Sequence, residues 1–399
     1  MSEKNDNKVP NVPNLRFSGF TDEWVKNKLS NIAIIVDGTH QTPKYQDDGI
    51  KFASVENINN PYLSDKFISE EDYKENYKLK PRINDILMTR ITAGIIGETY
   101  VIDKTEPLAY YVSLALIRPS IGYNSEFLST NIHTYRFRKE LDKRIIKVAF
   151  PQKINLNDIG ECSIYTCSLK EQEKIVKIFK VIDEKISTQN KIISNLESLI
   201  KGIRQRIFSA SNFDIRNSKE YELGSFLSEY SKKNVENNLI SVSVGKYGIR
   251  RRDEIYSKEL SDDYSKNKVI EKDSLIIGMG STQIDIGILS KDEKYCVSPA
   301  YTTYKISGIN SDYLREYLIH LNGLLSKRYM VIGARQGKSV NKSELMQHVL
   351  LVHSTEKQLK IVDIFNVFYD KLQKEKDILS LYKKQKAYLL SNTPVMVGN

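Results

Sequence analysis

Cysteine, tryptophan and long apolar runs are scarce in this sequence. Its 399 residues include one tryptophan and three cysteines, Cys162, Cys167 and Cys296, which are too few for a disulfide scaffold and typical of a protein kept in a reducing compartment. No segment approaches the roughly 18 apolar residues of a membrane helix. Residues 1–11 also lack the apolar core of a signal peptide. We therefore expect a cytoplasmic protein that neither spans a membrane nor is secreted.

Motifs for catalysis and metal binding are incomplete. The segment 333–339 resembles a phosphate-binding loop, but three residues separate its glycines where that loop has four. The tripeptide at 60–62 resembles part of an amino-methyltransferase clamp, yet one proline and a glycine-rich cofactor loop are missing. Four residues separate Cys162 from Cys167, which is unlike a zinc site, and the five histidines show no paired ligand spacing. The sequence predicts a chain with no catalytic residue, bound metal or bound cofactor.

Basic residues outnumber acidic ones, but unevenly. The 60 basic and 50 acidic residues give a net charge of +10 at pH 7, which favours a polyanionic partner without identifying it. Residues 168–210 carry nine basic and five acidic side chains, and residues 355–392 carry eight and five. Because these segments hold most of the excess, we expect the chain alone to bind a polyanion weakly, and less as salt rises.

The chain contains an internal repeat. Residues 172–179 and 358–365 match at six of eight positions with an offset of 186, and residues 85–88 align with 273–276 at an offset of 188. A drift of this size is what loop insertions produce, and a period near 190 is far above the roughly 20–50 residues of solenoid repeats. We infer the duplication of a large unit in which a globular part precedes a long helix.

The repeated segments continue into amphipathic helices. Apolar residues recur in steps of four and three, the 3.5-residue period of a coiled coil, and polar Gln189 and Glu375 occupy the same step in both copies. Such residues can fix register and partner choice, or they can simply face solvent. The predicted seam consists of Ile175, Phe179, Ile182, Ile186, Gln189, Ile193 and Leu196, and in the second copy of Ile361, Phe365, Phe368, Leu372, Glu375, Leu379 and Tyr382.

The two helices can act as a spacer. Each would extend about 50 Å at 1.5 Å per residue. The simplest arrangement pairs them antiparallel, which would relate the globular parts by a pseudo-twofold axis. Pairing of each helix with a partner's helix is the alternative. A spacer between two globular parts suits two half-sites on a duplex.

The segments outside the helices give mixed signals. Short β-branched and aromatic runs predict strands, for example over 86–89 and 274–277, while 125–147 and 311–329 predict helices. The predicted fold class is α+β, with two mixed globular domains separated by two long antiparallel coiled-coil helices in a pseudo-twofold repeat. The expected parts are an N-terminal arm (1–19), a first globular domain (20–165), a first long helix (166–210), a linker (211–221), a second globular domain (222–352), a second long helix (353–392) and a tail (393–399).

Several stretches carry a family resemblance. Residues 13–29 contain Pro-Asn-Leu-Arg-Phe followed by Glu23 and Trp24, and residues 37–43 read Asp-Gly-Thr-His-Gln-Thr-Pro. The loops 152–155 and 336–341 lead into helix starts that contain Gln172 and Gln358. In this duplicated order, over nearly the whole chain, the sequence resembles the specificity subunit of type I restriction–modification systems.

That resemblance implies a non-catalytic DNA-binding role. Each globular domain would be a target recognition domain that reads one half of an asymmetric, interrupted site in double-stranded DNA. The helices would set the gap and dock two modification subunits, which methylate adenine N6. S-adenosylmethionine, ATP and Mg would be bound by partner subunits, including restriction subunits that translocate and cleave DNA.

Candidate DNA contacts come from loops with polar and basic side chains, which can reach base edges or phosphates. The second domain has no counterpart of the loop at His40, so the two domains would read different sequences. The candidates in the first domain are Thr39, His40, Gln41, Thr42, Lys44, Arg90, Thr92, Gln152 and Lys153. Those in the second are Lys246, Tyr247, Arg250, Arg251, Arg252, Ser281, Thr282, Gln283, Arg335, Gln336 and Lys338.

Two other functions remain open from the sequence. A duplicated coiled coil can serve as an assembly scaffold without reading DNA. A self-sufficient DNA methyltransferase or nuclease is the third possibility, and the missing cofactor loop argues against it. We favour the specificity subunit.

Overall fold

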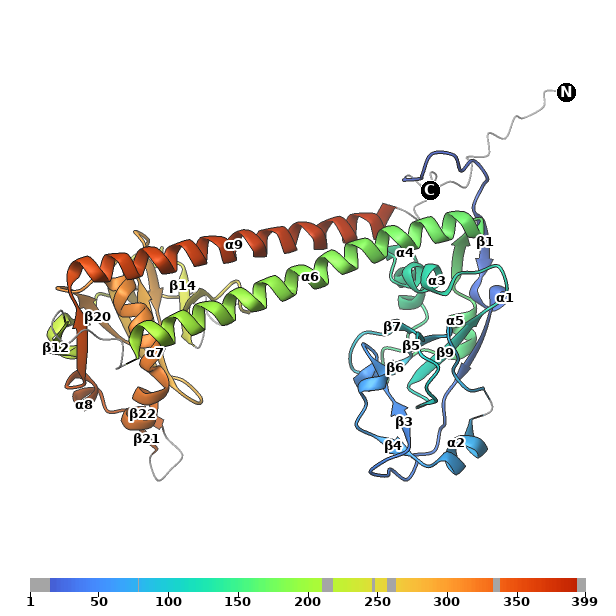
Figure 1. Ribbon diagram of the computed structural model, residues 1–399, viewed down its shortest axis with the longest axis horizontal. Helices are drawn as coiled ribbons and strands as arrows, with labels where there is room; N and C mark the ends of the chain where they lie inside the picture. The colour runs from blue at the N-terminus through green and yellow to red at the C-terminus, as the bar shows by residue number, and fades with distance from the viewer. Residues whose placement is uncertain are drawn as a thin grey trace. The chain divides into compact units, whose positions relative to one another are not determined.

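The computed structural model describes residues 15–77, 79–209, 218–245, 248–256, 263–332 and 338–392. These residues form two units, here called unit 1 (residues up to 190 and from 377 onward) and unit 2 (191–376). Both combine mixed sheets with helices (Figure 1), so the predicted α+β fold class is confirmed. Among the described residues, no helix is long and apolar enough to cross a membrane.

Unit 1 contains the recognition body that precedes the first long helix. The strand order is β2-β9-β5-β7 in its larger sheet and β4-β3-β8 in a second sheet, while β1 pairs with β11 and β6 with β10. The elements are β1 (Val25–Lys28), α1 (Leu29–Ile32), β2 (Ala33–Asp37), β3 (Ile50–Ala53), β4 (Phe67–Ile68), α2 (Glu70–Asn76), β5 (Ile86–Thr89), β6 (Ile91–Thr92), β7 (Thr99–Val101), β8 (Leu108–Tyr110), β9 (Leu114–Pro119), α3 (Ser125–Ile132), α4 (Tyr135–Asp142), β10 (Gln152–Lys153), α5 (Leu156–Gly160), β11 (Ser163–Thr166) and α6 (Leu169–Phe208), with short 3-10 turns at Val55–Asn57 and Pro61–Leu63.

Unit 2 repeats this arrangement. Its larger sheet has the order β13-β20-β17-β18, its second sheet has the order β15-β14-β19-β16, and β12 pairs with β23 as β1 does with β11. The elements are β12 (Ser218–Glu222), a 3-10 turn (Leu223–Phe226), β13 (Leu227–Tyr230), β14 (Ser241–Gly245), β15 (Gly248–Arg251), β16 (Lys268–Ile270), β17 (Ser274–Met279), β18 (Ile284–Leu289), β19 (Tyr295–Val297), β20 (Thr302–Ile306), α7 (Ser311–Tyr329), β21 (Met330–Ile332), β22 (Lys338–Val340), α8 (Lys342–Met346), β23 (Val349–His353) and α9 (Thr355–Asn392).

The parallel strand pair in each second sheet shows how closely the units correspond. β3 runs parallel to β8 in unit 1, and β14 runs parallel to β19 in unit 2, although every other ladder in the described residues is antiparallel. A parallel pair needs a long crossover connection. Its occurrence in both units therefore supports the duplication that the sequence repeat predicts.

A glutamine fixes the start of each long helix. The Gln172 side chain accepts a hydrogen bond from the backbone N–H of Asn124 at 2.9 Å and donates to the carbonyl of Cys167 at 2.8 Å. Gln358 does the same with Asn310 at 3.1 Å and with His353 at 2.8 Å. Because both amides are buried, these bonds link the long helix of each unit to the N-cap of a body helix.

One predicted helix is broken. The sequence predicted a single helix over 125–147, but α3 ends at Ile132 and α4 begins at Tyr135. Thr134 has extended dihedral angles and caps α4, because its hydroxyl accepts from the backbone N–H of Phe137. A residue that caps one helix cannot continue another. The equivalent helix α7 spans Ser311–Tyr329 without a break, as predicted.

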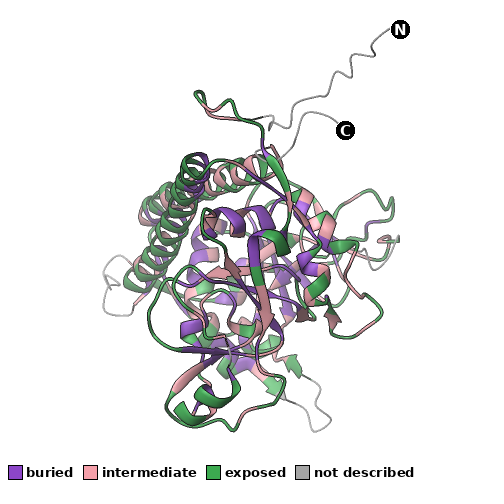
Figure 2. Cartoon of the chain, turned by 90° about the vertical axis from the view of Figure 1, so that its right-hand side faces the viewer, coloured by how far each residue is buried: buried purple, intermediate pink, exposed green. Residues whose placement is uncertain are grey.

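The seam residues of both long helices are buried or half-buried, while most intervening positions are exposed (Figure 2). Gln189 is buried and Glu375 is half-buried, so neither simply faces solvent. In unit 1, Asp183 of α6 pairs with Lys386 of α9 at 2.5 Å. In unit 2, Glu197 pairs with Lys376 at 3.0 Å. As α6 advances its contacts in α9 move backward, so the helices run antiparallel within each unit.

Two buried histidines make stability depend on pH. Burial, with a contribution from Arg138, lowers the pKa of His133 to about 4, and its ring bonds Thr99 at 2.8 Å and Arg138 at 2.9 Å. Burial, with a contribution from Lys357, lowers the pKa of His353 to about 4. Both rings are therefore held neutral in the folded state, although the unfolded chain protonates them near pH 6.5.

We predict that the free energy of unfolding falls between pH 6.5 and pH 4, because the unfolded state binds more protons there. The expected loss is about 2 kcal/mol per histidine. Urea unfolding at pH 7 and pH 4.5 checks it, with His133→Gln and His353→Gln reducing the difference. His40→Gln, at an exposed position, is the control. An unchanged pH difference in the double variant would show that these rings do not cause it.

Candidate nucleic-acid interface

Asp37 organises the candidate surface of unit 1. It lies at the end of β2, and its Oδ2 is 3.0 Å from His40 Nε2 and 3.2 Å from Arg90 Nη1. The loop after β2 is also tied to the sheet by backbone bonds of Thr39, whose N–H donates to the Tyr110 carbonyl at 3.2 Å. One carboxylate therefore connects the His40 loop to the strand region around Arg90.

Arg90 has a different role from the one that the sequence suggested. Its side chain is buried, and besides Asp37 its guanidinium donates to the carbonyls of Val112 at 2.8 Å and Ile154 at 3.2 Å. Burial lowers the pKa of Arg90, partly offset by Asp37. We expected a direct DNA contact, but these bonds leave the guanidinium no access to a ligand. Arg90 is instead a positioning residue that joins three loops.

The remaining candidates of unit 1 keep their side chains available. β10 pairs with β6 in a register that places Gln152 opposite Thr92, and Arg90 binds the next carbonyl after β10. The surface therefore combines hydroxyl, amide, imidazole and ammonium groups, which suit base edges and phosphates. Exposed members are His40, Gln41, Thr42, Lys44 and Lys153, and half-buried members are Thr39, Thr92 and Gln152.

The hairpin candidates of unit 2 are partly engaged. Arg251 pairs with Asp253 at 2.5 Å and with Glu254 at 3.9 Å, so its charge is already balanced. Arg252 donates to the Ser243 hydroxyl at 3.2 Å and lies 5.0 Å from the centre of the Tyr256 ring. Arg250, also predicted, is exposed at the end of β15. Of the three arginines, Arg251 is least suited to a phosphate contact.

A second group of candidates in unit 2 is brought together by tertiary structure. Ser281, Thr282 and Gln283 form the turn between β17 and β18, which the Gly280 N–H closes by donating to the Gln283 carbonyl at 3.1 Å. Lys338, from β22, donates to the Ser281 carbonyl at 2.5 Å. The predicted contacts Lys246, Tyr247, Arg335 and Gln336 lie outside the described residues.

Sequence reasoning missed the residues that hold this surface together. Asp37 and Gly38 were noted only as parts of a motif, yet Asp37 is its centre. A Cβ on Gly38 would lie 2.0 Å from the Tyr110 carbonyl oxygen, so only glycine lets the loop cross β8 this closely. An Asp-Gly pair directly after an apolar strand was the available signal.

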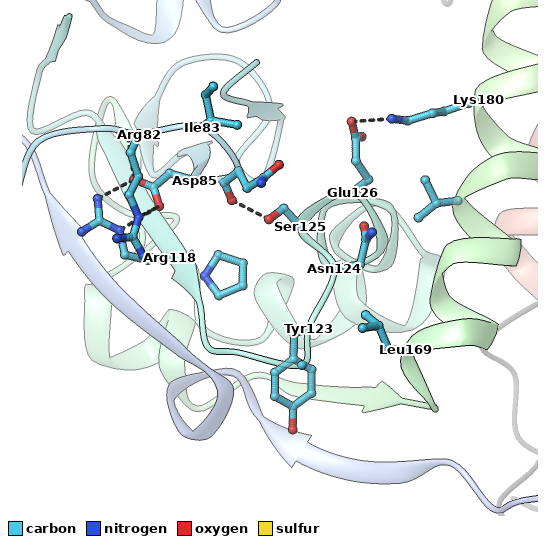
Figure 3. Close-up of a pocket in the computed structure, with 14 residues that line it drawn as sticks. Arg82, Ile83, Asp85, Arg118, Tyr123, Asn124, Ser125, Glu126, Leu169 and Lys180 are labelled. Atoms are coloured by element: carbon cyan, nitrogen blue, oxygen red, sulfur yellow. Dashed lines mark hydrogen bonds and ion pairs between the residues drawn. The ribbon is translucent and has the colours of Figure 1, made fainter. Parts of the chain in front are cut away.

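A polar pocket of about 390 Å³ in unit 1 lies elsewhere, beside the start of α6 (Figure 3). Arg118 pairs there with buried Asp85 at 2.6 Å, and Lys180 pairs with Glu126 at 3.1 Å. None of the predicted DNA contacts lines it. Because its charges are largely balanced internally, it does not resemble an anion site.

The described residues contain no cluster of three or more histidine, cysteine or acidic side chains that could hold a metal ion. Burial raises the pKa of Cys162 to about 12, which keeps the thiol protonated. A protonated thiol is a poor metal ligand and nucleophile. Cys162 is therefore a core residue.

Comparison with known proteins gives consistent matches. Residues 21–198 match the family described as type I restriction modification DNA specificity domain. A curated MjaX type I restriction enzyme specificity subunit from Methanocaldococcus jannaschii is 26% identical over 224 residues. That alignment covers 54% of this chain and 53% of the relative, so the match spans about half of each protein.

Solved structures match over more of the chain. The S subunit of a type I restriction–modification system from M. genitalium has a TM-score of 0.55 at 14% identity, covering 97% of this chain and 100% of that one. A chain from work on complex assembly and conformational transition of the type I R-M system has a TM-score of 0.60 at 14% identity, covering 93% and 97%. These likenesses show the fold. Together with the family match, they confirm the resemblance inferred from the sequence.

We predict that Gly38→Ala lowers the free energy of unfolding by about 2 kcal/mol, because the added Cβ forces the His40 loop away from the Tyr110 carbonyl. Gly323→Ala in α7 is the matched control, since nothing lies within 4 Å of its Cβ. That change is expected to stabilise by about 0.5–1 kcal/mol. Urea unfolding measures both, and equal effects of the two variants would contradict the assignment of Gly38.

Proposed function

Because residues 21–198 belong to the type I restriction modification DNA specificity domain family, we propose that this chain is the DNA-recognition subunit of a type I restriction–modification complex. Each unit reads one half of an asymmetric, interrupted DNA site. The long helices set the gap between the half-sites and dock two modification subunits. The chain performs no catalysis itself.

The observation that carries this proposal is the convergence around Asp37. Three segments that are distant in the sequence, at His40, Thr92 and Lys153, are joined through Asp37 and Arg90. The exposed side chains include donors and acceptors for base edges and lysines for phosphates. A coiled-coil scaffold that never reads DNA has no need for this arrangement.

The two units favour an asymmetric site. The topology of their sheets is shared, but the candidate contacts come from different places: a loop after β2 in unit 1, and the β14–β15 hairpin with the β17–β18 turn in unit 2. Two different reading surfaces recognise two different half-sites. The 40-residue α6, about 60 Å long at 1.5 Å per residue, supplies the spacing.

Chemistry would then belong to the partners. The modification subunits would bind S-adenosylmethionine and methylate adenine N6, and restriction subunits would use ATP and Mg²⁺ to translocate and cleave DNA. This division agrees with the incomplete catalytic and cofactor motifs of the chain. It also agrees with its modest positive charge, since the partners would complete the affinity for DNA.

Deletion of the gene tests the function. A methylation map of the host with and without the gene should show loss of N6-methyladenine at one interrupted two-part motif. If the map stays unchanged even when the modification subunits are supplied, the chain is an assembly scaffold. Loss of methylation at an uninterrupted motif would contradict reading by two units.

We predict separable effects at the unit 1 surface in the reconstituted complex. Gln41→Ala should relax the choice at one base pair at a cost of about 1–3 kcal/mol. Lys153→Ala should weaken all sequences alike and reduce the dependence on salt. Lys28→Ala, which breaks an exposed pair with Glu161 on β1, is the control. Binding competition at several salt concentrations distinguishes the three, and indistinguishable variants would argue against this surface.

Repeated apolar positions suggest where two identical partners dock. Ile178 and Val181 of α6 are exposed, and so are Ile364 and Val367 of α9, which lie 186 residues further along. Exposed apolar residues at matching positions in both copies are unusual for chance scatter. We assign them to the docking of one modification subunit on each helix.

We predict that Val181→Asp and Val367→Asp each remove one modification subunit, because the charge would be buried at the interface. Native mass spectrometry of the purified complex should show one fewer copy for each single variant and none for the double variant. Leu381→Asp is the control, since Leu381 is exposed but has Asn195 at the equivalent position. Full occupancy in the double variant would place the docking surface elsewhere.

A further inference from the structure

The end of α6 enters a charged site in unit 2. Arg204 Nε and Nη2 donate to Glu316 Oε2 at 3.0 and 2.8 Å, and Nη2 also donates to the Tyr369 hydroxyl at 2.9 Å. The Tyr369 hydroxyl donates to Glu316 Oε1 at 3.0 Å, and Arg315 Nε pairs with the same oxygen at 3.1 Å. Glu316 is completely buried. We call this site, formed by Glu316, Tyr369, Arg315 and Phe365, socket 2.

The end of α9 enters an apolar site in unit 1. Leu390 packs with Leu389 against the core of the unit, beside Trp24, Phe127 and Phe179. Thr130 also lines this site. The space left over is about 10 Å³, too little to hydrate a charge. We call this site, formed by Trp24, Phe127, Thr130, Ile175 and Phe179, socket 1.

The two sockets are equivalent by the repeat but differ in chemistry. The offset of 186 relates Phe179 to Phe365 and Ile175 to Ile361, which preserves the apolar floor. The positions that differ at the same offset are Leu390 against Arg204, Thr130 against Glu316, and Asp183 against Tyr369. Similar shape with different charge is the means by which related interfaces avoid wrong pairings.

We propose that the sockets form a pairing lock, in which socket 2 accepts the Arg204 end of α6 and socket 1 accepts the Leu390 end of α9. Unit 1 of one copy therefore does not pair with unit 1 of another copy, nor unit 2 with unit 2. The lock concerns assembly of the chain and stands whether or not the chain reads DNA.

The wrong pairing is costly in socket 1. Arg204 would lie among aromatic side chains with Thr130 in place of a carboxylate, and an unpaired buried charge is strongly unfavourable. Asp183 is the one nearby acid, and in this pairing Ile200 would replace its partner Lys386. Asp183 is 51% exposed, so a pair with Arg204 at that rim would contribute little.

The wrong pairing is also costly in socket 2. Leu390 would deprive buried Glu316 of two charge-assisted hydrogen bonds from Arg204. Lys386 would take the place of Ile200, which is only 4% exposed, and would lose its hydration. Both mismatches bury a charge without its partner.

Reconstitution of the chain from two co-expressed pieces, broken between Ser209 and Ser218, tests the lock. The first piece is made with two different tags, and the second piece is always present. We expect each tagged first piece to co-purify with the second piece at least about tenfold more than with the other first piece. The variant Arg204→Leu with Glu316→Thr, which gives α6 and socket 2 the chemistry of unit 1, should make pairs of first pieces common.

Lys376→Ala is the control, because it removes an exposed pair with Glu197 outside the sockets and should leave the selection unchanged. The lock is refuted if wild-type first pieces pair with each other as readily as with the second piece. It is also refuted if the double variant selects as strictly as the wild type.

The full chain decides the question if the pieces fail to assemble. Leu390→Arg should lower the urea midpoint, because socket 1 has no buried acid. Adding Thr130→Glu should restore most of the loss, since it supplies the equivalent of Glu316. Additive losses from the two changes would overturn the proposal, because independent sites add.

Discussion

The buried glutamine at the start of each long helix is the interaction on which the rest of the structure depends. Gln172 bonds the N-cap segment of α3 and the end of the β11 connection, and Gln358 bonds the equivalent points before α7 and α9. A helix joined to its body by a fixed side chain cannot rotate freely about its first turn. The direction of each long helix therefore follows from its own body.

From that junction, the same scaffold carries two unlike surfaces. The sheet orders and the parallel strand pairs are shared between the units. The loops differ: one unit is organised by Asp37 and Arg90, and the other by a hairpin and a turn that Lys338 joins. Stable, repeated cores with variable loops allow each surface to change without disturbing the fold. The helix sockets follow the same plan, with a shared apolar floor and different charges.

The sequence predicts those features that depend on local periodicity. The steps of four and three residues predict the long helices α6 and α9, and α7 follows its predicted bounds. The break between α3 and α4 was missed because Thr134 caps a helix only when the preceding turn stops, which tertiary packing decides.

Charged residues were the least predictable part. Arg90 looked like a DNA contact, but its partners are Asp37, 53 residues away, and the Ile154 carbonyl, 64 residues away. No local pattern reveals such pairings. Buried Glu316 is likewise satisfied by Arg204, 112 residues away. Side chains that become structural through distant partners cannot be separated from functional ones in a single sequence.

The central claim is that two chemically different units each read one half of an interrupted DNA site. The most direct measurement replaces residues 20–165 by the corresponding segment of a relative with another specificity and then maps N6-methyladenine in the host. The account predicts that one half of the methylated motif changes while the other half and the gap stay the same. Simultaneous change of both halves, or of neither, would contradict it.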